Sequence, residues 1–298
     1  MLAARKKHAM DAGKLPLERS LVEYTDGTTV FEGYVARPAG LAQRTPCVLL
    51  AHEWSGLNAA MRRCADQLAA LGYIGFAADV YGKGVRGDEL GDNAHLMGPM
   101  MADRRLFRRR LLAGFDAATR FPGVDAHRMA ALGYCFGALC ALDLACAAPP
   151  NLLATVSFHG VLHAPRIGPQ APITSSILLL HGWEDPVAPP NDVLGIAGEL
   201  TGAGADWQLH AYGHARHAFT FEGRIFRNVA LPMMRRRTAG PGRQCRPSWP
   251  NGLPRVCHPR QPDRPAQAPA ATSLQDALVL RPTFRISCVT RPRYWSKT

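Results

Sequence analysis

The sequence has no long apolar run and no cysteine spacing typical of a metal site. No stretch reaches the roughly 18 apolar residues of a membrane span, and residues 1–10 lack the apolar run of a signal peptide. The eight cysteines include no Cys-x-x-Cys pair and no Cys/His ligand spacing. No internal repeat is present. These absences exclude a membrane helix and a zinc-binding module, and they predict a cytoplasmic protein.

Acidic residues are nearly missing from the last quarter of the chain. Residues 1–221 hold 20 basic and 20 acidic side chains, whereas residues 222–298 hold 15 basic and 3 acidic ones. The tail therefore carries the whole net charge of +12, and it also contains 11 of the 24 prolines. Proline interrupts helical and strand periodicity. We predict one α/β domain over residues 1–221 and a basic, Pro- and Arg-rich tail of low order over residues 222–298.

Apolar runs alternate with helix-forming runs through most of the first part. The seven runs expected to form strands are 29–36, 47–51, 74–78, 128–132, 153–158, 177–181 and 206–212. Buried parallel strands are near-continuous apolar runs, and the helices between them cover the sheet. The sequence therefore predicts a mostly parallel sheet with helices on both faces.

Cys135 lies at the centre of a pentapeptide that is flanked by glycines. The segment reads Gly133-Tyr134-Cys135-Phe136-Gly137, with a strand-like run before it and a helix-forming run after it. A nucleophile held in a sharp strand-turn-helix needs small neighbours, and a helix N-terminus favours a thiolate. This pattern indicates a cysteine nucleophile. A buried cysteine in a glycine-flanked turn is the alternative.

A nucleophile elbow predicts an acid and then a histidine farther along the chain. Glu184 and Asp185 both follow the sixth expected strand. Asp185 is favoured because it precedes a proline, which holds it extended. His214 and His217 both follow the seventh expected strand. Either histidine is a candidate for the base.

The loop after the second expected strand contains Trp54. Acyl transfer needs hydrogen-bond donors for the oxyanion. In hydrolases with a nucleophile elbow these donors are the NH after the nucleophile and an NH from the loop after an earlier strand. We therefore predict an oxyanion hole made by the backbone NH groups of Phe136 and Trp54.

Taken together, these segments resemble the dienelactone hydrolase family. The matching segments are His52-Glu53-Trp54-x-Gly56, Gly72-Tyr73, Ala78-Asp79-Val80-Tyr81-Gly82, Gly133-Tyr134-Cys135-Phe136-Gly137, His181-Gly182-x-x-Asp185 and His217-Ala218-Phe219. The resemblance spans about residues 21–220 and implies an α/β-hydrolase fold. It implies a triad of Cys135, Asp185 and His217, with His217 preferred because it precedes Ala-Phe. The implied activity is hydrolysis of a small carboxylic ester or lactone, of the carboxymethylenebutenolidase type, through a thioester and without a metal or organic cofactor.

The resemblance also implies a role for Glu53. It falls on the family's glutamate that contacts the resting cysteine and is displaced when substrate binds. A carboxylate near the sulfur disfavours thiolate until an anionic substrate arrives. The alternative is a loop carboxylate at the following helix.

The segment after the base departs from the family pattern. Family members that open dienelactone hold the substrate carboxylate with arginines, one of them shortly after the catalytic histidine. Here the first arginine after Phe219 is Arg224. A helix expected before the elbow strand carries Arg104, Arg105, Arg108, Arg109 and Arg110. These arginines either contact substrate or form a solvated face, so ester or lactone hydrolysis is predicted without a commitment to dienelactone.

The basic tail permits other interpretations of the whole chain. Its 14 arginines are able to neutralise phosphates, but its scattered aromatics and lack of a recognition motif do not indicate nucleic acid as a partner. A hydrolase-fold protein with a nucleic-acid-binding arm is one alternative. A degenerate, inactive hydrolase without its last helix is another. We expect a monomer or homodimer.

The tail as written does not supply the helix that the fold needs after the histidine loop. One choice of synonymous codons for residues 232–245 gives, in another frame, Tyr-Asp-Ala-Ala-Ala-Asp-Arg-Arg-Ser-Trp-Gln-Ala-Met. This sequence favours a helix and is similar to the terminal helix of the family. We therefore hypothesise a frameshift between about residues 220 and 233.

Limited proteolysis tests this hypothesis. Without the terminal helix, apolar sheet surface beside the His217 loop stays uncovered, at a cost of several kcal/mol for about 25 cal/mol per Å². We expect poor solubility, early cleavage within residues 222–298 and a resistant fragment ending near Phe221, whereas a chain in the corrected frame is soluble and active. A full chain that melts cooperatively and resists protease through Thr298 contradicts the frameshift. The coding DNA decides it directly.

Overall fold

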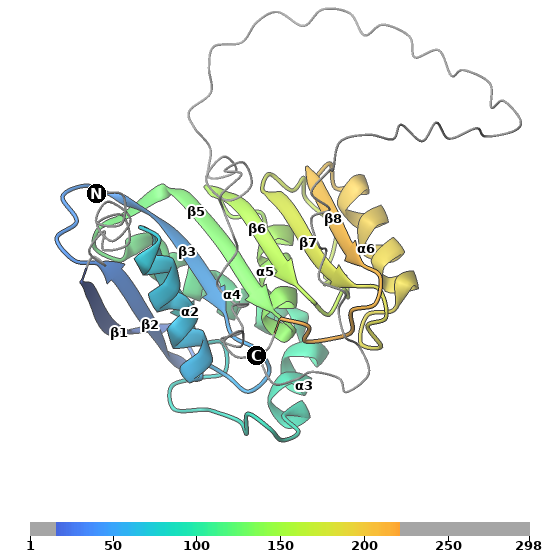
Figure 1. Ribbon diagram of the computed structural model, residues 1–298, viewed down its shortest axis with the longest axis horizontal. Helices are drawn as coiled ribbons and strands as arrows, with labels where there is room; N and C mark the ends of the chain where they lie inside the picture. The colour runs from blue at the N-terminus through green and yellow to red at the C-terminus, as the bar shows by residue number, and fades with distance from the viewer. Residues whose placement is uncertain (1–15, 221–298) are drawn as a thin grey trace, which may run out of the picture. The chain divides into compact units, whose positions relative to one another are not determined.

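The computed structural model describes residues 16–220, which fall within one compact unit. The low order predicted for residues 222–298 lies outside the described residues, and so do residues 221–233 of the segment in which the frameshift is hypothesised. Eight strands form one sheet in the order β1-β2-β4-β3-β5-β6-β7-β8 (Figure 1). No described helix is long and apolar enough to cross a membrane.

The sheet is mostly parallel, as the sequence predicts. Its strands are β1 (Leu17–Thr25), β2 (Val30–Pro38), β3 (Thr45–Ala51), β4 (Ile74–Ala78), β5 (Val124–Tyr134), β6 (Leu152–Phe158), β7 (Ser176–Gly182) and β8 (Trp207–Tyr212). β1 pairs with β2 and β2 pairs with β4 in antiparallel fashion, whereas the pairings from β4 through β8 are parallel. The seven predicted strands are present. β1 is an additional edge strand, and its largely exposed side chains left no apolar run to find.

Helices cover both faces of the sheet, which confirms the predicted α/β-hydrolase architecture. The described helices are α2 (Ala59–Ala70), α3 (Ala94–Ala102), α4 (Arg104–Arg120), α5 (Phe136–Cys146) and α6 (Pro190–Gly202). Figure 1 shows α2 in front of the sheet and α4 and α5 behind it. Apolar side chains of α4, α5 and α6 share one core with the sheet. Those of α2 form a second core against the other face.

α5 is buried along almost its whole length and lies against the central strands. The approach is so close that two backbone positions have no room for a side chain. A Cβ on Gly133 would lie 1.9 Å from the carbonyl oxygen of Gly137, and a Cβ on Gly137 would lie 2.3 Å from the carbonyl oxygen of Ala51 in β3. Both glycines of the pentapeptide are therefore required by backbone packing, and this packing fixes where α5 begins.

Replacing Gly137 with alanine is expected to destabilise the fold. The new Cβ meets backbone rather than a flexible side chain. β3 and α5 must therefore move apart, which is expected to lower the free energy of unfolding by about 3 kcal/mol. The matched control is Gly198→Ala on α6, where nothing lies within 4 Å of an added Cβ and helix propensity adds up to about 1 kcal/mol of stability. Thermal unfolding of the two variants measures the difference. Equal midpoints contradict the packing argument.

Candidate active site

Cys135 occupies the turn between β5 and α5. Its backbone has φ 55° and ψ −118°, a conformation that costs energy for a residue with a side chain. The Cys135 NH donates to the Phe158 carbonyl oxygen at 3.1 Å, which ties the turn to the end of β6. The turn thus holds the thiol at the N-terminus of α5, at the carboxyl ends of the parallel strands.

The structure brings Cys135, His217 and Asp185 into one hydrogen-bonded row. His217 Nε2 lies 3.0 Å from Cys135 Sγ, and His217 Nδ1 lies 2.8 Å from Asp185 Oδ2. The three residues follow β5, β8 and β7 respectively, and the carboxyl ends of parallel strands meet at one edge of a sheet. An acid, an imidazole and a thiol that are distant in sequence therefore meet there.

The two loops that carry the acid and the imidazole are joined by their backbones. The Trp183 NH donates to the Tyr212 carbonyl at 2.9 Å, and the Glu184 NH donates to the Ala215 carbonyl at 3.0 Å. A Cβ on Gly182 would lie 2.6 Å from the Ala215 oxygen, so this approach also depends on glycine. These contacts fix the acid relative to the imidazole independently of their side chains.

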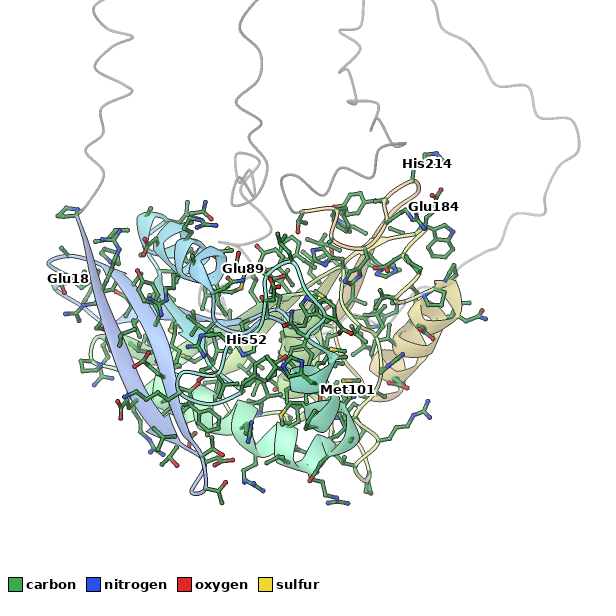
Figure 2. All side chains as sticks on the ribbon, turned by 90° about the horizontal axis from the view of Figure 1, so that it is seen from below. Glu18, His52, Glu89, Met101, Glu184 and His214 are labelled. Atoms are coloured by element: carbon green, nitrogen blue, oxygen red, sulfur yellow. The ribbon has the colours of Figure 1, made fainter. Side chains whose placement is uncertain are left out.

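The competing residues Glu184 and His214 form a separate pair at the surface. Glu184 Oε1 lies 3.2 Å from His214 Nδ1, and the side chains are 49% and 76% exposed. Figure 2 shows both at the outer edge of the molecule. Asp185, in contrast, is only 1% exposed. Burial and contact with the thiol therefore distinguish Asp185 and His217 from their neighbours.

The electrostatics of the row favour a charged imidazole. Burial acts to raise the pKa of Asp185, but hydrogen bonds from His217 and from the Val187 NH outweigh it and lower that pKa. Burial acts to lower the pKa of His217, but its contacts with Asp185 and Cys135 raise it to about 9. An imidazolium beside the sulfur stabilises a thiolate.

The two segments predicted to supply oxyanion donors lie close together. Phe136 is the first residue of α5, where the helix offers its NH no partner. Trp54 lies in a turn after β3, and its carbonyl oxygen accepts from the Tyr81 hydroxyl at 3.0 Å. The Tyr81 ring stacks on the Phe136 ring at 5.8 Å between centroids. Tyr81 therefore connects the Trp54 turn to the start of α5.

Glu53 is held by the beginning of the next helix. The Asn58 side-chain amide donates to Glu53 Oε1 at 3.3 Å and to Ser55 Oγ at 3.1 Å, while Asn58 Oδ1 accepts from the Met61 NH and caps α2. This contact matches the alternative of a loop carboxylate at the following helix. The expected contact between Glu53 and the resting cysteine stays a prediction.

His159 is a neighbour of the row that the sequence interpretation missed. It follows β6 directly, and its ring lies 5.2 Å edge-on from the His217 ring. Its Nε2 lies 2.7 Å from Thr220 Oγ1. Burial, and then the charge of His217, lower its pKa to about 3, so it is a neutral packing partner. Its place at the end of a parallel strand was the available signal.

The arginine run of α4 makes structural contacts. Arg104 forms a buried ion pair with Asp143 of α5, so for this residue the expectation of a solvated face is wrong. Arg108 donates to the Ala147 carbonyl at 3.2 Å, Arg109 to Asp26 at 3.3 Å and Arg110 to the Val80 carbonyl at 2.9 Å. These four arginines therefore join α4 to neighbouring segments.

A cavity of about 300 Å³ lies away from the thiol. Its walls include Cys146, Ile173, Ile196 and Leu200. Cys146 ends the helix that Cys135 begins, and 11 residues of helix span about 16 Å, so this cavity is not part of the site. Within residues 16–220 no group of three His, Cys, Asp or Glu side chains is arranged to hold a metal.

Comparisons with known proteins show the family to which this fold belongs. Residues 31–234 match the family model described as the dienelactone hydrolase family. A provisionally named carboxymethylenebutenolidase of Aquifex aeolicus is 27% identical over 212 residues, covering 68% of this chain and 88% of that protein. The crystal structure of a dienelactone hydrolase-like promiscuous phosphotriesterase from metagenomic libraries is 33% identical, with a TM-score of 0.61, covering 68% of this chain and 84% of its own.

More distant structures share the fold alone. The acylaminoacyl peptidase of Pyrococcus horikoshii is 15% identical with a TM-score of 0.54, covering 68% of this chain and 38% of its own. The family match covers more than half of the residues and contains every residue of the row, the elbow and the Trp54 turn. The chain therefore belongs to the dienelactone hydrolase family.

Proposed function

We propose that this protein hydrolyses carboxylic ester or lactone bonds, with Cys135 as the nucleophile, His217 as the base and Asp185 as the group that orients His217. The observation that carries the proposal is the row of hydrogen bonds from Sγ through the imidazole to a buried carboxylate. The name of the Aquifex relative refers to a lactone hydrolase, which agrees with this chemistry.

The reaction proceeds through a thioester in two halves. The Cys135 thiolate, paired with the His217 imidazolium, attacks the carbonyl carbon, and the NH groups of Phe136 and Trp54 stabilise the oxyanion. The C–O bond then breaks, and the leaving alkoxide or enolate takes the proton from His217. Water attacks the thioester and gives a proton to His217. The carboxylic acid leaves, and the thiolate is regenerated.

Glu53 is proposed to restrain the thiol before substrate binds. It directly precedes Trp54 in the same loop, and the Asn58 amide, 3.3 Å from Glu53 Oε1, offers the carboxylate a place away from the sulfur. An anionic substrate that displaces Glu53 toward Asn58 therefore releases the thiolate. We propose a small ester or lactone as the substrate. We also propose a reducing, cytoplasmic location, because a reactive thiol in a chain with other cysteines suits a reducing compartment.

Replacing Cys135 tests the nucleophile. Cys135→Ala is expected to lower the hydrolysis of p-nitrophenyl acetate by about 10⁴-fold or more, because no other group carries out the attack. Cys140→Ala and Cys146→Ala serve as matched controls and are expected to be nearly silent, since both lie farther along α5 and pack in the core. Equal losses in all three variants indicate structural cysteines. Full activity of Cys135→Ala indicates another site.

Replacing Asp185 tests the acid and the electrostatics together. Asp185→Asn is expected to lower kcat by about 10²- to 10⁴-fold. It also removes an interaction that holds the His217 pKa at about 9 and leaves the burial that lowers it, so the His217 titration seen by NMR shifts to lower pH. Glu184→Gln is the matched control and changes neither quantity.

Replacing the histidines tests the base. His217→Ala is expected to cost far more activity than His214→Ala. The reverse order indicates that the site lies at the exposed pair of Glu184 and His214.

A further inference from the structure

His52 is a fully buried histidine whose two ring nitrogens both contact backbone. It follows β3 directly and is 1% exposed. Its Nδ1 lies 2.7 Å from the Glu53 carbonyl oxygen, and its Nε2 lies 3.2 Å from the Val80 NH. The triad proposed above does not use this side chain.

The two contacts fix the tautomer of the ring. A backbone NH only donates and a carbonyl oxygen only accepts. His52 Nε2 must therefore accept from Val80, and His52 Nδ1 must carry the proton that it donates to Glu53. Burial lowers the pKa of His52, and Asp79, 3.9 Å from Nε2, opposes this only in part. The ring is thus neutral, with its proton on Nδ1.

The acceptor of that proton belongs to the peptide that ends in the Trp54 NH. The Glu53 carbonyl and the Trp54 NH are the two ends of one planar unit and point in opposite directions. The Gly56 NH also donates to the Glu53 oxygen, at 3.0 Å. Holding the oxygen therefore sets the direction of the NH. Hydrogen bonds to the carbonyl also polarise the NH and strengthen its donation.

The His52 ring also packs beside the second donor. Its centroid lies 4.6 Å from that of Tyr81 and 6.3 Å from that of Phe136. The Tyr81 hydroxyl holds the Trp54 carbonyl at 3.0 Å. The His52 ring thus contacts the Glu53–Trp54 peptide, whose NH is one proposed oxyanion donor. It also lies beside the rings of Tyr81 and Phe136, and the Phe136 NH is the other proposed donor.

We propose that His52 is a positioning residue of the oxyanion hole: its neutral ring fixes and polarises the Glu53–Trp54 peptide so that the Trp54 NH points at the developing oxyanion. This inference rests on the proposed function. The ring exchanges no proton with substrate and acts only through the peptide.

Two substitutions separate the two ring contacts. In His52→Asn the amide nitrogen takes roughly the place of Nδ1, which keeps the donor to Glu53 and loses the acceptor for Val80. In His52→Gln the amide oxygen takes roughly the place of Nε2, which keeps the acceptor and loses the donor. Both variants remove the buried ring. A purely structural role therefore predicts similar losses of activity from both.

We expect the donor to decide the rate. For p-nitrophenyl acetate, His52→Gln is expected to lower kcat by about 10- to 100-fold with little change in KM, below the 10²- to 10³-fold cost of removing an oxyanion donor outright. His52→Asn is expected to stay within about 5-fold of the parent chain. Inhibition by trifluoroacetone, which forms a tetrahedral oxyanion on the thiol, is expected to weaken in parallel with kcat/KM.

Alkylation of Cys135 by iodoacetamide provides the control. It forms no oxyanion, so its rate is expected to be unchanged in both variants. Equal kcat losses in the two variants, or a fall in alkylation that matches the fall in kcat, overturns the role of His52. If only His52→Asn folds, a kcat loss above 50-fold with normal alkylation also overturns it. Hydrolysis that survives Cys135→Ala refutes the proposed function instead, so the two failures are distinguishable.

Discussion

The close contact between α5 and the central strands is the constraint on which the site depends. With no side chain at Gly137, the first turn of α5 lies against the Ala51 carbonyl at the end of β3. The same contact places Cys135 and the Phe136 NH beside the loop that contains Trp54. The packing that closes the core thus also brings together the proposed nucleophile and both proposed donors. A methyl group added at Gly137 would push the start of α5 away from β3 and the Trp54 loop.

Three histidines near the elbow differ in charge because their partners differ. His217 contacts Asp185 and the thiol, and these outweigh burial and raise its pKa to about 9. His159 has the His217 charge beside it, so burial and repulsion act together and lower its pKa to about 3. His52 has only a partial counterweight in Asp79 and also stays neutral. The groups that face each ring thus decide whether its imidazole is charged or neutral.

A buried ion pair away from the site helps to hold the helices together. Arg104 and Asp143 join α4 to α5 in a buried pair, and burial keeps the Asp143 pKa raised, at about 6, even with this partner. Removing one member of such a pair leaves a buried charge without compensation. The pair therefore fixes α5 relative to α4. Because Cys135 immediately precedes α5, the pair also helps to position the elbow.

The sequence by itself determined the features that depend on neighbours along the chain. The turn at Cys135, the alternation of strands and helices and the chain order of the candidate cysteine, acid and histidine are visible because turn sterics and burial periodicity are local. Tertiary structure decided between adjacent candidates: periodicity does not tell whether Asp185 or Glu184 points inward, nor whether His217 or His214 reaches the thiol. The edge strand β1 and the contacts of His159 and His52 also emerged only in three dimensions. Strands distant in sequence create those contacts, and no local pattern encodes them.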